Sequence, residues 1–272
     1  ETAYDSSNAL KIERSYYQFP IGDEFTATIG ALVRQDDMLA VWPSSYPSDS
    51  ILDVLTYAGA NAAYSLAEGQ GAGITYAKDQ LSASLLFVST EGTDSNPDTG
   101  GLMTNGSADD VTLQVAWTGE TYTVAAAMTT SDEGEGNGDV SEENFTAFGL
   151  SWDWNTGTET SFLPDTVSAG VGFKTLEEEN KGHDLQDSNT WSLGLQWNDA
   201  WVDGNTLGMG IGSSENWKDH HNGQEQEDPI AAELFYSMAV SDNVTVTPAV
   251  FVQEKTGKEG FVGALVKTTF TF

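Results

Sequence analysis

The feature that most constrains this chain is an alternation of apolar and polar residues that recurs along most of its length. In the final segment, 260–272, every second residue from Val262 to Phe272 is apolar or Thr, and the residues between them include Gly, Lys and Thr. A period of two residues is that of a β-strand whose two faces meet different surroundings. The aromatic residue beside the terminal carboxylate favours a strand that ends at a membrane–water interface.

About thirteen such segments follow one another, each of roughly ten residues. Ten residues tilted by about 45° span roughly 23 Å, which is close to the apolar height of a membrane barrel. Their connections alternate between long acidic loops and shorter turns, the latter near residues 20, 79, 119, 158, 199 and 241. Barrels with tight periplasmic turns and long extracellular loops have this asymmetry. The prediction is an all-β chain, a transmembrane antiparallel β-barrel that occupies residues 1–272 as one domain.

The number of segments is odd, which bears on how such a barrel closes. If the last strand runs toward the periplasm, alternation makes the first visible strand run the same way. Antiparallel closure then needs an odd number of further strands. We expect these strands to precede Glu1, which gives sixteen strands in the complete barrel, or fourteen as the alternative. The chain begins with Glu and carries no signal peptide, so we expect a processed or trimmed product.

Composition excludes several classes of protein. The formal charge is −32 with only ten Lys and Arg, which makes nucleic acid and anionic lipid surfaces poor partners. The absence of cysteine excludes disulfides, thiolate metal sites and Cys nucleophiles. His183, His220 and His221 lie in acidic loops, away from strand ends where a catalytic His would be expected, so no enzyme is predicted.

The acidic loops leave a second interpretation open. The stretches 132–135, 177–179 and 219–221 carry carboxylates that could collect Ca²⁺ or a transition metal. Their spacing matches no established ligand loop, so solvated acidic loops are favoured, and no metal or cofactor is predicted.

The outward faces of the strands carry the aromatic residues expected at the two membrane interfaces. In the segment 25–34, for example, Phe25, Ile29 and Val33 fall on the apolar face. The predicted membrane girdle consists of Trp117, Trp152, Trp154, Trp191, Trp197, Phe270 and Phe272.

The opposite faces are small and polar, and they contain few charges. Two compatible interpretations of the small residues stay open: they leave the lumen wide, and they accommodate a loop that folds inward. The small residues include Ser84, Gly149, Gly170, Gly172, Gly194, Gly208 and Gly210. The charges predicted to line a pore are Asp153, Lys174, Glu233 and Lys267.

The long connection 35–70 is the strongest candidate for a functional element. Ser48-Asp49-Ser50 can cap a helix whose apolar face contains Ile51, Leu52, Val54, Leu55 and Ala58, and Gly59 would end it. That face needs burial against the inside of the barrel or against a neighbouring subunit. We expect the inward placement, which predicts a constriction formed by Arg34, Asp36, Asp37 and Asp53. Opposed charges there would filter small solutes by charge and size.

Two stretches carry a family resemblance: Tyr16-Tyr-Gln-Phe-Pro-Ile-Gly-Asp23 and Val33-Arg-Gln-Asp-Asp-Met-Leu-Ala-Val-Trp-Pro43. They resemble cyanobacterial outer-membrane porins of the carbohydrate-selective porin (OprB-like) superfamily. The resemblance implies a homotrimer of sixteen-stranded barrels and an upstream surface-layer-homology domain that contacts peptidoglycan, which is absent from this chain. Members of this branch are associated more with inorganic ions than with carbohydrate.

Together these features predict a porin in the outer-membrane lipid bilayer. It would allow passive diffusion of ions and small hydrophilic solutes through a water-filled barrel with a charged constriction and a mild cation preference. A carbohydrate-selective channel and a metal-collecting surface protein remain the alternatives.

Overall fold

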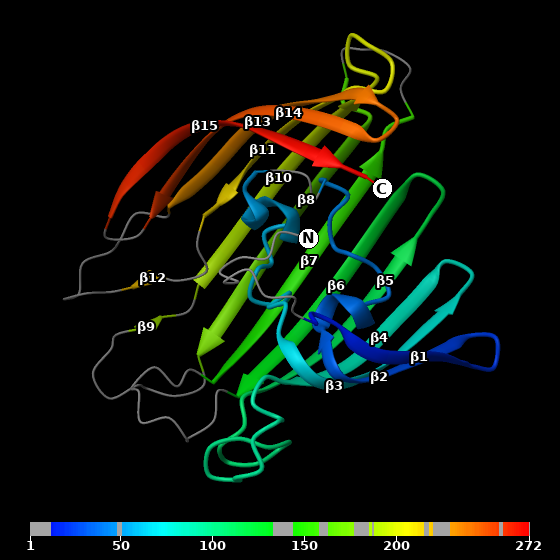
Figure 1. The fold of residues 1–272 in the computed structure, drawn as a ribbon, viewed down its shortest axis with the longest axis vertical. Helices are drawn as coiled ribbons and strands as arrows, with labels where there is room; N and C mark the ends of the chain where they lie inside the picture. Colours follow the sequence, from blue (N-terminus) through cyan, green and yellow to red (C-terminus); the bar gives the residue numbers. More distant parts are fainter. Residues whose placement is uncertain are drawn as a thin grey trace.

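The computed structural model describes residues 12–47, 51–132, 144–157, 163–176, 185–186, 188–214, 218–219, 229–255 and 258–271. Thirteen antiparallel strands form one curved sheet, which confirms the predicted fold class and the number of visible strands (Figure 1). The strands are β1 (Ser15–Ile21), β2 (Phe25–Arg34), β3 (Glu68–Lys78), β4 (Leu81–Ser89), β5 (Asp109–Thr118), β6 (Tyr122–Asp132), β7 (Phe145–Asn155), β8 (Thr166–Leu176), β10 (Ser188–Asn198), β11 (Thr206–Ser213), β13 (Ile230–Ser241), β14 (Val244–Lys255) and β15 (Lys258–Phe270).

Two very short strands, β9 (Leu185–Gln186) and β12 (Lys218–Asp219), were not predicted. They pair with each other in a separate two-stranded ribbon. In the main sheet β8 therefore pairs with β10, and β11 pairs with β13. Within the described part of the chain, no helix is long and apolar enough to cross a membrane.

The two faces of the sheet differ as the alternation predicts. On β5 the outward Leu113 is 47% exposed, whereas the inward Thr112 and Gln114 are fully buried. Leu113 is paired with Met128, which is paired with Phe148 on the next strand, so exposed apolar side chains form a continuous band. A sheet that exposes its large apolar residues and buries its polar ones has the reverse of a soluble arrangement, as expected for contact with lipid.

The prediction for Val33 is wrong. This residue is fully buried with Met38, Leu86 and Val88 instead of lying on the outward apolar face. The register between β2 and β3 shifts between Gly30 and Val33, where β2 contains one extra residue. A bulge of one residue reverses which face the following side chains occupy, and the alternation alone does not reveal it.

The first hairpin also differs from the prediction, because its turn follows Ile21 instead of beginning at Pro20. Pro20 lies within β1 and is paired with Thr26. A proline is tolerated there because β1 is the edge of the sheet and has a neighbour on one side only.

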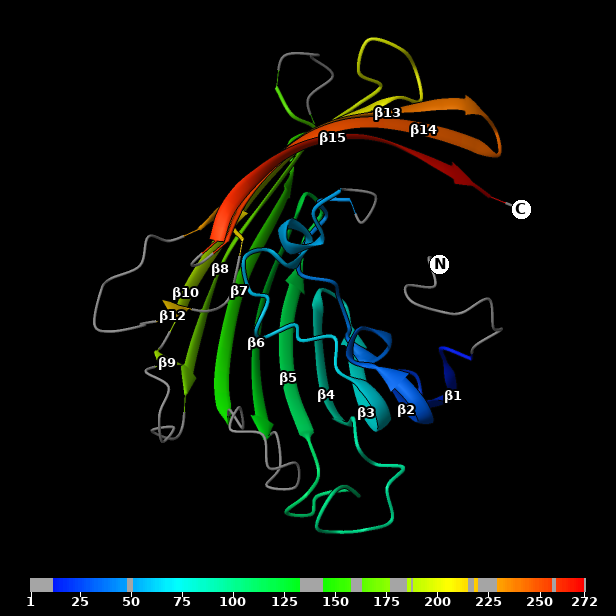
Figure 2. The ribbon, with the colours of Figure 1, turned by 60° about the vertical axis from the view of Figure 1, so that its left-hand side comes forward.

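The edge strands β1 and β15 are not paired with each other, and Figure 2 shows them on separate sides of the curved sheet. Since all thirteen strands are antiparallel to their neighbours, β1 and β15 run in the same direction. Each edge therefore presents backbone N–H and C=O groups that a further strand could pair with.

Candidate functional site

The connection between β2 and β3, residues 35–67, lies on the concave face of the sheet (Figure 2). It contains two short 3₁₀ helices, η1 (Gln35–Met38) and η2 (Asp53–Tyr57). Its residues pack against at least four strands, and three buried clusters form between this inner loop and the sheet. We call residues 35–67 the inner loop.

The helix predicted in the inner loop is shorter and tighter than expected. The residue before η2 is Leu52, which provides no side-chain cap, and Ser48–Ser50 lie outside the described residues. Ala58 and Gly59 both adopt left-handed conformations, with φ of 52° and 69°, so the helix ends there. Leu52 and Leu55 are buried against Phe235 of β13, whereas Asp53 is exposed.

The glycines on the inner face accommodate this loop, as the second of the two interpretations above expects. A Cβ atom at Gly170 would lie 2.2 Å from the carbonyl oxygen of Ala58, and one at Gly172 would lie 2.5 Å from that of Gly59. A Cβ at Gly194 would meet the ring of Tyr46 at 2.5 Å. The loop backbone therefore lies directly on β8 and β10, where no larger side chain fits.

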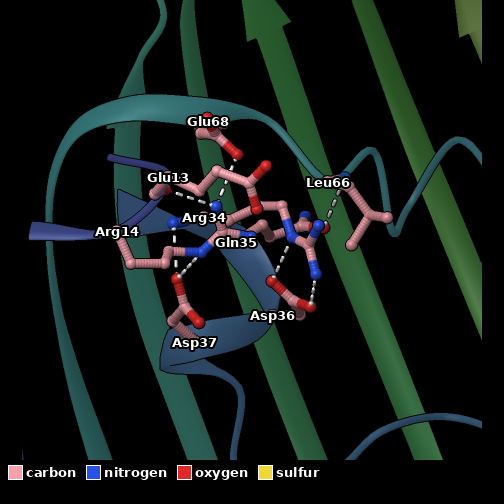
Figure 3. Close-up of polar contacts among 8 residues, drawn as sticks. All are labelled: Glu13, Arg14, Arg34, Gln35, Asp36, Asp37, Leu66 and Glu68. Carbon is pink, nitrogen blue, oxygen red and sulfur yellow. Dashed lines mark hydrogen bonds and ion pairs between the residues drawn. The ribbon is translucent and has the colours of Figure 1, made fainter. Parts of the chain in front are cut away.

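Gln35 joins both ends of the inner loop to the sheet, and sequence reasoning missed it. Its backbone N–H donates to the Ala67 carbonyl (2.9 Å), and its side-chain oxygen accepts from the Leu66 N–H (3.1 Å; Figure 3). Its side-chain nitrogen donates to the Ala63 carbonyl (3.1 Å) and to the Thr112 hydroxyl (2.7 Å). The side chain is fully buried, which the adjacent acidic residues in the sequence do not suggest.

Gln114 of β5 holds the middle of the loop in a similar way. It accepts a hydrogen bond from the Val41 N–H (3.2 Å) and donates to the Val41 carbonyl (2.8 Å) and to the Tyr64 hydroxyl (3.2 Å). Ser84 accepts from the Ala40 N–H at 2.6 Å. Irregular backbone inside a protein needs such partners, and the polar inner faces of the strands supply them.

Glu233 lies on the inner face as predicted, but it is only 3% exposed and does not face open water. Its carboxylate accepts hydrogen bonds from the Tyr46 hydroxyl (2.8 Å), the Ile51 N–H (2.9 Å) and the Leu52 N–H (2.6 Å). Burial and the Glu233 carboxylate raise the pKa of Tyr46, so this hydroxyl remains a donor. Glu233 thus holds the far part of the loop against β13.

The other charges predicted to line a pore have different surroundings. Lys174 is 4% exposed, and its ammonium group lies 3.9 Å from the centre of the Phe145 ring. Asp153 accepts a hydrogen bond from the Ser45 N–H at 2.9 Å. Lys267 of β15 is half-buried. For Glu233 the inner loop replaces water, a contact that strand alternation cannot indicate.

Three of the four predicted constriction residues lie together where the inner loop begins. Arg34 makes a bidentate ion pair with Asp36, with N–O distances of 2.7 and 2.5 Å (Figure 3). Asp37 accepts from the Arg34 N–H at 2.8 Å and pairs with Arg14 at 2.7 Å. These side chains are 18–30% exposed. Arg14, which the predicted site omits, also bridges to Glu68 at 2.6 Å and so ties the two ends of the loop.

The fourth residue, Asp53, is the first residue of η2, and Tyr57 is the last. Burial raises the pKa of the Tyr57 hydroxyl, and so do the charges of Asp53 and Asp36, whereas the Arg34 guanidinium lowers it. The predicted site omits Tyr57. No residue pattern in the sequence marks it.

The aromatic residues of the predicted girdle lie mainly at the short-turn end of the sheet. Trp152 and Trp154 are stacked at 6.1 Å on the outer face, 46% and 41% exposed. Trp154 is paired with Tyr122 at the turn between β5 and β6. The remaining positions are distributed as follows: Trp117, Trp197 and Phe270 lie near the same end, Trp191 lies at the opposite end of β10, and Phe272 falls outside the described residues.

Metal ligands are not assembled in the described part of the chain, where no group of three or more His, Asp or Glu side chains is arranged to hold an ion. His183, His220 and His221, and most of the acidic stretches singled out above, lie outside the described residues.

Comparisons with known proteins identify the fold. No family model and no curated protein matches the sequence. Among solved structures, a mutant porin of Rh. blastica aligns over 94% of this chain and 76% of its own, with a TM-score of 0.54 and 12% identity. OprB of Pseudomonas putida aligns over 94% and 71% (TM-score 0.57, 11% identity), and OmpT of Vibrio cholerae over 92% and 78% (TM-score 0.59, 11% identity). The chain has the fold of an outer-membrane porin barrel.

Proposed function

We propose that this chain forms a porin of the bacterial outer membrane, through which ions and small hydrophilic solutes diffuse passively. The observation that carries the proposal is the combination of an apolar exposed outer face with an inner loop held on the polar inner face. A barrel that encloses water in a membrane needs an apolar outer face, and a size limit on the solutes that cross it needs an inner loop. The role is that of a channel and not of an enzyme.

The charged groups at the inner loop support a mild cation preference. Carboxylates outnumber guanidinium groups there, and they remain partly exposed. The carboxylates are those of Asp36, Asp37, Asp53 and Glu68, and the guanidinium groups are those of Arg14 and Arg34. A local excess of negative charge raises the concentration of cations in a narrow passage. The formal charge of −32 acts in the same direction.

Closure of the barrel requires more strands than the thirteen observed. Edge strands that run in the same direction can be joined by antiparallel pairing only through an odd number of further strands. Within the membrane, each backbone N–H or C=O group without a hydrogen-bond partner costs on the order of several kcal/mol, so open sheet edges are unfavourable there. We propose three additional strands and a sixteen-stranded barrel. The solved porins support this, because 24% of the Rh. blastica chain and 29% of OprB lie outside the aligned part, from coverages of 76% and 71%.

The homotrimer and the peptidoglycan contact are implied by the family resemblance described above. Both belong to the proposal for the complete protein, and any peptidoglycan contact would be made by a region outside this chain.

Planar-bilayer recording of the purified complete protein tests the proposal. We expect discrete ohmic steps and, in a salt gradient, a reversal potential that indicates cation preference. Absence of conductance would contradict the channel. Sugars added during recording would test the carbohydrate-selective alternative, because a bound sugar interrupts the ion current.

A further inference from the structure

Two adjacent hollows open on the outer face of the sheet over β10, β11, β13, β14 and β15, which follow one another in the sheet (Figure 1). Their volumes are about 490 and 590 Å³, and both are lined by Leu234 and Val250, so we treat them as one outer groove. A row of outward side chains, paired in register from strand to strand, crosses it: Leu195, Met209, Leu234, Val250 and Ala264. The outer groove therefore belongs to the exposed apolar face that contacts lipid.

The length of the outer groove matches one leaflet of a membrane. Along β13 the groove extends from Ala232 to Tyr236, and along β14 from Val252 to Pro248. Five successive residues are about half of the 9–11 residues with which a tilted strand crosses the apolar core of a bilayer. An acyl chain of a single lipid occupies the same depth, so the groove has the dimensions of an acyl-chain site.

Trp201 forms the wall at one end of the outer groove. It lies in the turn between β10 and β11, is 79% exposed, and has a left-handed backbone with φ of 61°. Its ring centre is 5.4 Å from that of Tyr236, and both side chains line the groove. A bulky residue with positive φ is uncommon and persists only where the surrounding structure holds it.

Hydrogen bonds to β13 provide that support. The Tyr236 hydroxyl donates to the Ala200 carbonyl (2.7 Å) and accepts from the Asn205 side-chain amide (2.8 Å). The side-chain oxygen of Asn205 accepts from the Ala239 N–H at 3.0 Å, and Asn205 is only 7% exposed. The turn is thus fixed to the strand, and the exposed indole of Trp201 is held at the groove. Trp and Tyr side chains favour the level of lipid headgroups.

The charges near this end of the outer groove favour one kind of headgroup. Asp199 and Asp203 are exposed in the same turn as Trp201, and Asp242 is exposed in the turn between β13 and β14. The sequence contains no Lys or Arg in residues 188–213 and 230–254. An ammonium group is attracted by these carboxylates, whereas a headgroup with net negative charge is repelled.

We propose that the outer groove binds one phospholipid with an ammonium-bearing, zwitterionic headgroup. An acyl chain lies along the row of apolar side chains, and the headgroup contacts Trp201 and the carboxylates of the two neighbouring turns. Contact of the chain with an apolar groove provides the affinity, and the carboxylates provide the selectivity. The inference goes beyond the channel function, because it depends on the lipid-facing outer surface and not on what crosses the lumen.

Native mass spectrometry of the complete protein tests the proposal, with dioleoyl phosphatidylethanolamine and dioleoyl phosphatidylglycerol added separately to the delipidated protein in detergent. We expect one phosphatidylethanolamine to be retained per chain. Ala232→Phe fills the groove and should weaken this retention by roughly tenfold, which corresponds to lost contact with about two methylene groups. Ala126→Phe, a matched change on the outward face of β6, should leave retention unchanged. Trp201→Ala should also weaken retention, whereas Trp154→Ala at another exposed tryptophan should not.

The possible outcomes are distinct. Equal retention by the natural chain and Ala232→Phe, or an equal loss in Ala126→Phe, would overturn the site, because the lipid would then lie elsewhere on the outer face. Equal retention of phosphatidylglycerol would overturn the headgroup selectivity.

A second copy of the chain is the competing occupant of the outer groove. The chain contains no cysteine, so Ala264→Cys provides a single thiol at the groove. A disulfide between two copies of this variant would overturn the lipid site. Conductance should be unchanged in Ala232→Phe, so bilayer recording distinguishes failure of this proposal from failure of the channel function.

Discussion

Two groups of charged side chains occupy the concave side of the sheet, and they differ in what covers them. Glu233 and Lys174 come from the strands and are 3% and 4% exposed; the inner loop covers Glu233, and the ring of Phe145 lies against Lys174. Arg34 and Asp36 come from the junction of strand and loop and are 30% and 25% exposed. An inward-facing charge is therefore not always an exposed one, because the inner loop covers Glu233 whereas Arg34 and Asp36 remain partly exposed.

The largest effect is expected from removing the carboxylate that holds the far part of the loop. Glu233→Ala leaves the Tyr46 hydroxyl and two backbone N–H groups without their acceptor. We expect a loss of about 3 kcal/mol or more, because each buried donor without a partner costs roughly 1–3 kcal/mol. Thermal unfolding in detergent would measure it, together with noisier single-channel currents.

Glu233→Gln is the matched control, because the amide keeps one acceptor oxygen in place. It should be clearly less destabilising than Glu233→Ala. Equal losses for the two variants would contradict the role of Glu233 as a hydrogen-bond acceptor for the loop.

A substitution that forces the loop away from the wall should have the next largest effect. The side chain of Gly172→Val would collide with the Gly59 carbonyl, which lies 2.5 Å from the position of a Cβ. Overpacking of this kind costs about 1–3 kcal/mol, and displacement of the loop should widen the passage and increase conductance. Val171→Leu enlarges the outward face of the same strand and should leave conductance unchanged. An unchanged current in Gly172→Val would show that the loop does not limit conduction.

A substitution in the partly exposed Arg34–Asp36 pair should have a smaller effect on stability and a measurable effect on ion selectivity. Asp36→Asn removes one negative charge beside Arg34 and should weaken cation preference, seen as a shift of the reversal potential toward zero. Its cost in stability should be below about 1 kcal/mol, since the pair is partly exposed and screened. Glu233→Gln removes the same charge beneath the loop. An equal shift in both variants would break the distinction between the two groups.

The smallest effect at neutral pH concerns Tyr64, whose buried hydroxyl accepts a hydrogen bond from Gln114. Burial raises the pKa of Tyr64 from 10.0 to about 12. A raised pKa in the folded state means that the stabilisation is complete below pH 10 and is lost as the pH rises from about 10 to 12. Tyr64→Phe should remove this part of the alkaline loss of stability, which unfolding measured against pH would detect. An identical alkaline profile in Tyr64→Phe would argue against the buried hydroxyl as its source.

Individual residues show where prediction from the sequence succeeds. The alternation of Leu113 and Gln114 places one outward and the other inward, because successive side chains of a strand point to opposite faces. Prediction from alternation fails at Val33, because one extra residue in β2 reverses the faces. The predicted helix is also too long at η2, because Ala58 and Gly59 adopt left-handed conformations that end it. Bulges and tight helix ends depend on how neighbouring strands and the loop fit together.

The order of residues was enough to establish the thirteen strands, their outward faces and the few charges that point inward, since these depend on a period of two residues and on turn length. The tertiary structure alone established which of those charges are buried. The inner loop is distant in sequence from the strands on which it lies. Its contacts with them include the hydrogen bonds of Gln35, Gln114 and Glu233 and the close approach to the inward-facing glycines. Such contacts join residues that no local pattern relates, and burial of the loop backbone requires them.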